Sequence, residues 1–495
     1  MDSVMIFTAL LSSSVLFLFL YFNIRRPSSS RLPPGPYPFP VIGNILSLGS
    51  SPHISLASLS KIHGPVMSLK LGSLTTIVVS SPETAQNILQ KNDRICSGRH
   101  VPDIFRILYH NEYSILFNSA NSQWRSLRKI IKEHIFSQPQ MDAKQGLRLK
   151  KVEELIAFVR RSSVVKIGDA TFTTTLNLLS DMFFSMNLAH HDSNLSREFK
   201  DHIRITLETA GSRNLADYFP IFRLVDVQGL RRRGRYHFTR LICIFEEIIQ
   251  RRIESKETKN DFLDALINLS QETHSTLTIN GIAHLFFDLF TTGTDTISTM
   301  VEWAMTELLT HPDKLKKAQE ELRAFAGDKV IIEEPDISKL PYIQLVVKET
   351  LRLHPPSPFM VPHRAEADFE IDTEEKYLFR VPKDAQILVN IWEIGRDPKV
   401  WEDPHAFIPE RFLKSEFDFN GQDFRYFPFG SGRRSCPGMV LGDRMVHLLL
   451  TSLLLSFDWK LENGINPQDI DMNDKFGISM QKAIPLMAIP IPIKS

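Results

Sequence analysis

The stretch FGSGRRSCPG, residues 429–438, brings one cysteine, two arginines and three glycines together near the C-terminal end of the chain. Binding a metal through sulfur requires a thiolate whose charge is stabilised in a rigid setting. The glycines permit a tight turn with N–H groups aimed at sulfur, and a helix starting after Pro437 adds its positive dipole end. A lone cysteine cannot hold zinc or an iron–sulfur cluster, but it can be the one axial ligand of haem. Cys436 is therefore a candidate haem ligand; a buried cysteine without a chemical role is the alternative.

The fixed positions of this stretch match a known signature. Phe429, Gly432, Arg434, Cys436 and Gly438 match F-x-x-G-x-R-x-C-x-G, and the whole chain resembles the cytochrome P-450 enzymes. The resemblance implies the cytochrome P-450 fold, mainly α with a minor β region. It also implies haem b, with Cys436 as the axial thiolate and the other four residues around the cofactor. The expected reaction is the insertion of one oxygen atom from O2 into a C–H bond.

Two further motifs stand in the order that the family requires. The segment KETLR carries Glu349 and Arg352, and the segment PERF supplies Arg411. Glu349 and Arg352 lie one helical turn apart, so an ion pair between them is expected. The resemblance implies that Arg411 joins them in a buried network beneath the haem.

The two propionates of haem need cationic partners. The segment WRSLR matches the W-x-x-x-R motif of the family as Trp124 and Arg128, and Arg434 is a further partner. In VPHRA, His363 stands where many relatives have arginine. Either His363 or the adjacent Arg364 is expected to meet a propionate.

Oxygen activation needs a controlled supply of protons. The segment TTGTDT, residues 291–296, resembles the A/G-G-x-D/E-T signature of the family, with Asp295 and Thr296 as the acid–alcohol pair. An apolar helical pattern runs on both sides, which argues against a turn. Thr292 stands where relatives commonly have Ala or Gly, and Ile297 where Thr or Ser is usual. Thr292 lies four residues before Thr296, so we expect both on the haem-facing side.

Electrons must come from a partner, because the chain has no flavin or nicotinamide fingerprint of its own. The resemblance implies NADPH-cytochrome P-450 reductase. Arg125, Arg128, Lys129 and Lys132 share one helical stripe, and Arg433 extends the positive charge. This basic face is complementary to an acidic reductase. A solvated basic face without a partner is the alternative.

By analogy with the family, four segments build the substrate pocket. Their candidate lining residues are Ile104, Phe105, Leu108, Phe286, Leu289, Thr292, Phe359, Met360, Val361, Ile478 and Ser479. Such a lining suits an apolar substrate. The segments ADYFP, IGRDP and KFGISMQKA are similar to plant microsomal enzymes that hydroxylate monoterpenols and diterpenes, which implies a terpenoid substrate. The alternatives are a phenolic or alkaloid substrate, a haem-thiolate isomerase or dehydratase without a reductase, and a non-enzymatic haem protein.

The composition is that of a globular protein. The 495 residues are 43% hydrophobic and 23% charged, and the formal net charge is +1, so nothing points to nucleic acid. The three cysteines offer no zinc spacing and no disulfide framework, which suits a reducing compartment.

Local patterns predict one large, mainly helical domain. Residues 65–80, PVMSLKLGSLTTIVVS, predict a β-hairpin around a Gly-Ser break. Residues 83–355 show a mostly helical pattern, and residues 359–400 form a second extended region. A further helix is expected at 437–456, directly after the cysteine stretch.

The N-terminal end predicts attachment to a membrane. The uncharged run MIFTALLSSSVLFLFLYF (5–22) is followed by Arg25 and Arg26, which favours a cytosolic location for the C-terminal side. A cleaved signal peptide is the alternative. We expect a single-pass protein of the endoplasmic reticulum membrane with a cytosolic catalytic domain. Its parts are a membrane anchor (1–24), a proline-rich hinge (25–40) and a haem-thiolate monooxygenase domain (41–495).

Overall fold

The computed structural model describes Ser13 and residues 32–493, except 189–193, 274, 328, 330, 373–377 and 414. The expected membrane anchor, apart from Ser13, and the first part of the proline-rich hinge therefore lie outside the described residues.

Helices are the main regular structure of the described chain, as the sequence predicts. The longer ones are α2 (Pro52–His63), α5 (Ser122–His134), α7 (Gln145–Arg161), α8 (Ile167–Phe184), α9 (Asn194–Gly211), α11 (Leu230–Ser255), α12 (Phe262–Gln271), α13 (Ile279–Thr310), α14 (Pro312–Ala326), α15 (Pro341–Leu353) and α17 (Met439–Ser456). The short ones are α3 (Pro82–Gln86), α4 (His110–Tyr113), α6 (Gln138–Ala143), α10 (Leu215–Tyr218) and α16 (Ile391–Ile394).

The largest sheet has five strands in the order β1-β2-β8-β5-β3. These are β1 (Val66–Leu71), β2 (Leu74–Val79), β8 (Gln386–Val389), β5 (His363–Arg364) and β3 (Gly98–Arg99). Strands β1 and β2 form the hairpin expected at 65–80. Strand β3 pairs antiparallel with β5, and this register places Arg99 opposite His363. Two segments far apart in the sequence thus meet at one edge of the sheet.

Three smaller sheets complete the β structure of the described residues. One contains β4 (Val165–Lys166), β12 (Met487–Pro492) and β9 (Phe457–Leu461); the others are the pairs β6 (Phe369–Asp372) with β7 (Leu378–Val381), and β10 (Asp474–Lys475) with β11 (Gln481–Lys482). The β10–β11 pair brings the C-terminal segment against the centre of the molecule, where it contacts α13.

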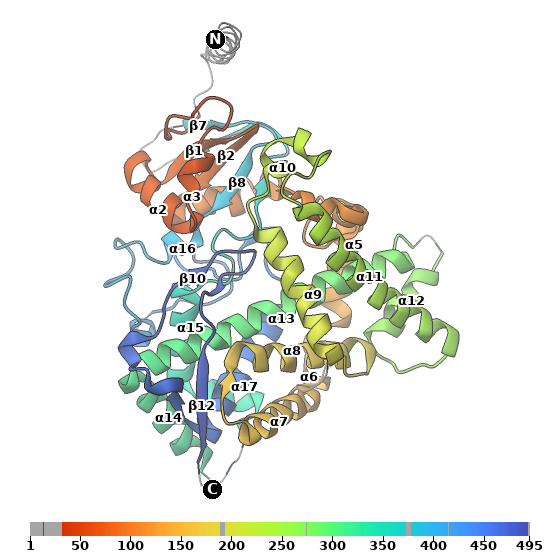
Figure 1. Cartoon of the computed structure of the whole chain (residues 1–495), viewed down its shortest axis with the longest axis vertical. Coiled ribbons are helices and arrows are strands. Elements are labelled where there is room, and N and C mark those ends of the chain that lie inside the picture. Colours follow the sequence, from red (N-terminus) through yellow and green to blue (C-terminus); the bar gives the residue numbers. More distant parts are fainter. Residues whose placement is uncertain are drawn as a thin grey trace, which may run out of the picture.

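Helix α13 crosses the middle of the molecule, with the five-stranded sheet at one end (Figure 1). Its first turn is capped by Thr278, whose hydroxyl accepts a hydrogen bond from the N–H of Gly281 at 3.0 Å. A helix that is apolar on all sides is a buried helix, and α8, α11 and α17 pack around this one. The fold is mainly α with a minor β region, which confirms the expected fold class.

One helix in the described part of the chain is long and apolar enough to cross a membrane. It is α17, and most of it is buried inside the fold. We interpret α17 as a core helix, because it packs on α7, α13, α14 and α15.

Glu349, Arg352 and Arg411 form one buried ion network. The Arg352 Nε and Nη2 atoms donate to the two oxygens of Glu349 at 2.7 and 2.8 Å, and Arg411 Nε donates to Oε1 at 3.0 Å. Arg352 Nη1 also donates to the carbonyls of Gly395 and Pro404 at 2.6 and 2.7 Å. The network ties α15 to the irregular segment that leads to the cysteine stretch.

We predict that Glu349→Gln lowers the free energy of unfolding by about 3–5 kcal/mol, because it leaves two buried guanidinium groups without a counter-charge. Glu320→Gln is the matched control, since the Lys316–Glu320 pair is exposed, with 3.7 Å between Nζ and Oε1. The control should cost less than about 1 kcal/mol. Urea unfolding followed by tryptophan fluorescence measures both, and equal losses would contradict the structural role of the network.

Candidate active site

The backbone of the cysteine turn is fixed by glycine. The N–H of Cys436 donates to the carbonyl of Phe429 at 2.9 Å, which closes the turn before α17 begins. Gly430 and Gly432 have φ values of +75° and +68°, where side chains are strained. A Cβ atom on Gly432 would lie 2.3 Å from the carbonyl oxygen of Leu89. The sequence folds into this turn because only glycine fits at these positions.

The Cys436 thiol is accessible although protein surrounds it. Its side chain is exposed, yet desolvation by the surrounding protein raises the pKa of the thiol. Both observations hold because the sulfur borders an internal space. The N–H of Gly438 and the charge of Arg128 lower this pKa and so favour the thiolate. Cys96, by contrast, is buried, and burial raises the pKa of its thiol to about 12.

Two arginines lie beside the cysteine turn, and each donates hydrogen bonds to backbone carbonyls. Arg128 Nη1 donates to the carbonyl of Ser435 at 2.9 Å. Arg434 donates through Nε to Ser97 at 3.0 Å and through Nη2 to Asn118 at 2.6 Å. No carboxylate of the described residues pairs with Arg128 or Arg434.

Arg99 adds a third charge to this cluster. It is 6% exposed, and its Nη1 donates to the carbonyl of Val361 at 2.5 Å. Burial, and then repulsion from Arg434 and Arg128, lower the pKa of Arg99. The same two causes, burial and the charge of Arg128, lower the pKa of Arg434 to about 10. Arg99 Nε and Arg434 Nη1 are buried without a hydrogen-bond partner in the described part of the chain.

His363 completes the cluster from the opposite strand. Its Nδ1 lies 2.7 Å from the carbonyl oxygen of Cys96, so Nδ1 carries the proton and donates. Burial, followed by the charge of Arg99, lowers the pKa of His363 well below its ordinary value. Its Nε2 is buried and has no partner among the described residues. A carboxylate at Nε2 would favour the doubly protonated ring, which donates from both nitrogens.

Arg364, the alternative propionate partner, is placed differently. Its guanidinium is half-buried and donates to Glu366 Oε1 at 3.2 Å. Its Nε, like His363 Nε2, is buried without a partner among the described residues, but Glu366 already gives this guanidinium a counter-charge, so the geometry favours His363. Unpaired buried donors around an excess of positive charge fit the two carboxylates of haem, with Cys436 as the iron ligand.

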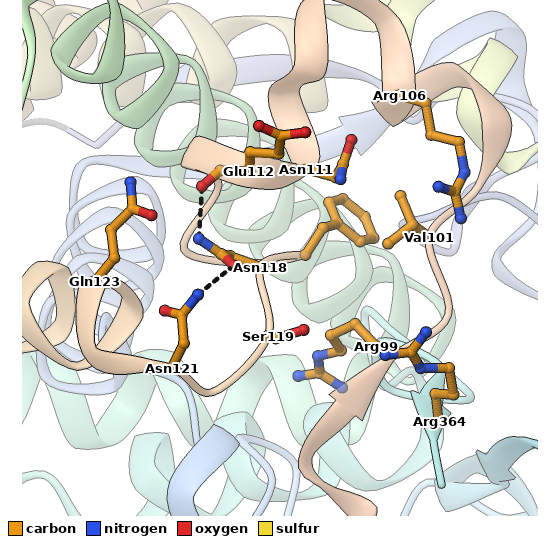
Figure 2. Close-up of a pocket in the computed structure, with 11 residues that line it drawn as sticks. Arg99, Val101, Arg106, Asn111, Glu112, Asn118, Ser119, Asn121, Gln123 and Arg364 are labelled. Carbon is orange, nitrogen blue, oxygen red and sulfur yellow. Dashed lines mark hydrogen bonds between the residues drawn. The ribbon is translucent and has the colours of Figure 1, made fainter. Parts of the chain in front are cut away.

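A polar pocket of about 390 Å³ opens next to the arginine cluster (Figure 2). Arg99 and Arg364 lie together on neighbouring strands, and Arg106 reaches in from the opposite side. Asn118 Nδ2 donates to the carbonyl of Glu112 at 2.5 Å, which shapes the loop on the third side. The polar lining shows that this pocket is not the apolar substrate pocket expected from the sequence.

Trp124 supports the arginines through its ring. Its indole N–H donates to the carbonyl of Ile115 at 2.9 Å. The guanidinium carbons of Arg434 and Arg128 lie 4.3 and 5.7 Å from the ring centroid. Because the N–H is already engaged, the structure shows a platform for two cations rather than a free donor to a propionate.

The centre of α13 presents one accessible stripe. Thr292 is exposed and Thr296 is half-buried, although residues 281–291 and 297–309 of the same helix are buried. Such exposure in the middle of a core helix means that both side chains border an internal space. Thr296 Oγ1 donates to the carbonyl of Thr292, and Thr292 Oγ1 to that of Asp288, both at 2.7 Å. Each hydroxyl therefore turns lone pairs, not its proton, toward the open side.

Asp295 lies on another face of α13. The residue is 5% exposed, and burial raises the pKa of its carboxyl to about 6. Gln481 Nε2 donates to Oδ1 at 2.5 Å. Hydrogen bonding from the Ser479 hydroxyl, followed by that from Gln481, lowers this pKa, although the Ser479 contact is not well oriented. Asp295 thus faces the C-terminal segment that also carries predicted pocket residues.

Phe286 does not lie on the accessible stripe of α13. It is fully buried in an aromatic core, with ring centroids 4.5 Å from Phe184, 5.9 Å from Phe183 and 6.0 Å from Phe262. The sequence placed it in the substrate pocket, and this expectation needs correction. Phe286 lies six residues before Thr292, about 120° around the helix, so it faces α8 and α12.

The segment after α15 divides among three parts of the core. Phe359 packs beneath the five-stranded sheet, and Met360 packs with residues around the cysteine turn, against Gly430. Val361 alone joins the main core that holds α13. Of these three predicted pocket residues, Val361 is therefore the one whose packing fits that role.

The remaining pocket candidates lie on segments around α13. Leu289 is 7% exposed on α13 itself. Ile104 packs against α11, where a Cβ on Gly234 would lie 1.8 Å from its Cδ1. Phe105 stacks on Phe117 with centroids 4.2 Å apart, and Leu108 is 40% exposed. The backbone N of Ile478 would lie 2.7 Å from a Cβ on Gly211, so the C-terminal turn touches the end of α9.

Asp288 is a further organising residue that sequence reasoning missed. His110 Nε2 lies 3.0 Å from its Oδ1, and Ser114 Oγ donates to its Oδ2 at 2.6 Å. The N–H of Ile115 donates to the same oxygen at 2.8 Å. Asp288 therefore fastens the loop before α5 to α13, and this loop carries the carbonyl that supports Trp124.

The basic face expected for a reductase is exposed on α5. Arg125, Lys129 and Lys132 are all exposed, whereas Arg128 turns inward to the cysteine turn. Arg433 donates to Asp93 Oδ1 at 2.6 Å, so its charge is partly neutralised. The exposed face is thus formed mainly by α5, with Arg433 exposed beside Asp93.

Residues 33–487 match the family model described as Cytochrome P450. The chain is 47% identical to a geraniol 8-hydroxylase of Catharanthus roseus over 99% of both chains. It is 44% identical to a geranylhydroquinone 3''-hydroxylase of Arnebia euchroma, over 96% of this chain and 97% of that one. It is 42% identical to a ferruginol synthase of Salvia miltiorrhiza over 99% of both chains.

The comparisons and the geometry agree on the chemistry. Members of this family bind haem b through a cysteine thiolate and use O2, a hydrophobic substrate and electrons from NADPH-cytochrome P450 reductase. Unpaired buried cations around Cys436 and an accessible stripe on a core helix are the features that such an enzyme requires. The chain belongs to the cytochrome P450 family and is a monooxygenase.

Proposed function

We propose that this monooxygenase hydroxylates a terpenoid, a monoterpenol or a diterpene. The observation that carries the proposal is the similarity over nearly the whole chain to a geraniol 8-hydroxylase and to two further relatives named for a prenylated or diterpene compound. Apolar side chains around α13, among them Leu289 and Val361, support a hydrocarbon-rich substrate.

We assign the haem contacts to residues on four segments. Arg99, Arg128, Arg434 and His363 hold the two carboxylates of the cofactor, and Cys436 supplies the thiolate. When bound, haem supplies the activation of O2 and the oxidation of the C–H bond. The protein orients the substrate over the stripe of α13 and keeps bulk water away from it.

Asp295 and Thr296 manage the protons of the reaction. A carboxyl whose pKa is raised to about 6 both takes up and releases a proton near neutral pH. The Thr296 hydroxyl donates to the helix backbone, so it accepts from a water held at the stripe. Thr292, one turn earlier, offers a second hydroxyl of the same orientation.

We further propose that the protein is anchored in the endoplasmic reticulum membrane through residues 5–22, with the catalytic domain in the cytosol. Plant relatives of this kind are membrane-anchored enzymes. Arg25 and Arg26 after the apolar run support the orientation. The proposed parts remain the anchor (1–24), the hinge (25–40) and the catalytic domain (41–495).

The substrate class is tested with microsomes that contain the protein and a plant reductase. Geraniol, ferruginol precursors and matched phenolic and alkaloid compounds are offered with NADPH, and products are read by mass spectrometry. We expect a hydroxylated terpenoid, with O2 and NADPH consumed only when the substrate is present. Conversion of a phenolic or alkaloid compound alone would contradict the terpenoid proposal, and turnover without NADPH would indicate an isomerase or dehydratase.

Cys436→Ala should abolish the red-shifted Soret band of the reduced protein with carbon monoxide, because that band depends on thiolate donation to iron. Cys96→Ala and Cys243→Ala are the matched controls and should keep the band. Loss of the band in either control, with retention in Cys436→Ala, would show that another cysteine is the ligand.

Thr296→Ala should keep haem, the carbon monoxide spectrum and substrate binding, because no haem contact is removed. NADPH consumption should persist while hydrogen peroxide rises and product per NADPH falls at least about tenfold, since Thr296 holds the water of a proton transfer that contributes about 10²–10⁴-fold. Thr292→Ala combined with Thr296→Ala should uncouple more than either change alone. Wild-type coupling in both the single and the double variant would remove the threonines from proton delivery.

A further inference from the structure

Gln481 makes the closest contact to the proposed proton donor. Its Nε2 donates to Asp295 Oδ1 at 2.5 Å, from β11 at the C-terminal end of the chain. The other oxygen, Oδ2, is buried and accepts no well-oriented hydrogen bond from the described residues. The two carboxyl oxygens of Asp295 are thus inequivalent: Oδ1 accepts a well-oriented hydrogen bond and Oδ2 does not.

The segment that carries Gln481 is rigidly attached on both sides. Trp303 Nε1, on α13, donates to the carbonyl of Met480 at 3.3 Å. The N–H of Met480 donates to the carbonyl of Pro356 at 2.7 Å, after α15. Gln481 itself pairs with Lys475 in the β10–β11 ladder. A side chain on such a frame can define the direction of a neighbouring group.

The charges that act on Asp295 are few. No cation of the described residues forms an ion pair with it, and Glu208 on α9 raises the pKa of its carboxyl further after burial. Lys475 Nζ lies 3.0 Å from Glu208 Oε1, so the β10–β11 pair both neutralises Glu208 and supplies Gln481. The Ser479 hydroxyl and the Gln481 amide are therefore the two groups that stabilise the ionised form of Asp295, and Gln481 makes the well-oriented hydrogen bond.

We propose that Gln481 is a positioning residue that fixes Asp295 through Oδ1 and leaves Oδ2 as the oxygen that gains and loses the proton. The proposal rests on the proposed role of Asp295 in proton delivery. The same turn contains Ile478 and Ser479 of the expected substrate pocket, so substrate contact with this turn reaches the acid through one hydrogen bond.

Two substitutions at this position act in opposite directions. Gln481→Met keeps the length of the side chain but removes the donor, so the ionised carboxyl loses its support and its pKa rises. Gln481→Lys places a cation at Oδ1, which lowers the pKa of Asp295. The measured quantity is product formed per NADPH between about pH 5.5 and 8.5, in reconstituted holoenzyme.

We expect the pH at which coupling changes to move up by about one unit in Gln481→Met and down by about one unit or more in Gln481→Lys. The carbon monoxide spectrum should stay as in wild type. Gln344→Met is the matched control. Gln344, on α15, also donates a hydrogen bond through its Nε2, to the carbonyl of Ile337 at 2.8 Å, but it does not contact Asp295. A purely structural role would lower stability without these opposite shifts.

An unchanged pH profile in Gln481→Met overturns the inference, whether or not Gln481→Lys yields folded holoenzyme. Asp295→Asn separates this failure from that of the proposed function. If Asp295→Asn removes the pH-dependent limb while Gln481→Met leaves it in place, only the role of Gln481 is wrong. If Asp295→Asn itself keeps wild-type coupling and pH dependence, Asp295 is not the proton donor and both proposals fail.

Discussion

Positive charge buried without a counter-charge is the constraint around which this active site is organised. Arg99, Arg128 and Arg434 gather beside the cysteine turn, and two of them keep buried N–H groups unpaired. Such a cluster is costly in a protein interior, because each charge is desolvated and repels the others. In the assignment proposed above, the two carboxylates of haem supply the missing negative charge. The binding of the cofactor therefore completes the interior of the fold as well as the catalytic centre.

The fold brings this charge together from distant parts of the sequence. The β3–β5 register sets Arg99 opposite His363, α5 supplies Arg128, and the cysteine turn supplies Arg434. Asp288 fastens the loop before α5 to α13. Helix α13 thus carries the accessible threonine stripe on one side. On another side it holds the loop that supports the arginines assigned to the haem carboxylates.

Residues with fixed local spacing were predictable from sequence. The cysteine turn, the Glu349–Arg352 pair and the helical segment of Thr292 and Thr296 each lie within a few residues, so local geometry limits where their side chains go. Arg99 and Gln481 were not predictable, because each acquires its partner only through the tertiary pairing of strands. Phe286 was misplaced because the sequence does not show which neighbours pack on each face of α13. Aromatic side chains of α8 and α12 pack on the face that carries Phe286.

The pairing of buried cations with the haem carboxylates is tested most directly by the affinity of the haem-free protein for haem and for haem dimethyl ester. The ester has the same ring and iron but no propionate charge. Charge-assisted hydrogen bonds contribute about 1.5–3 kcal/mol each, so haem should bind at least about 100-fold more tightly than the ester. Equal affinities for haem and its ester would show that the buried arginines do not serve the propionates.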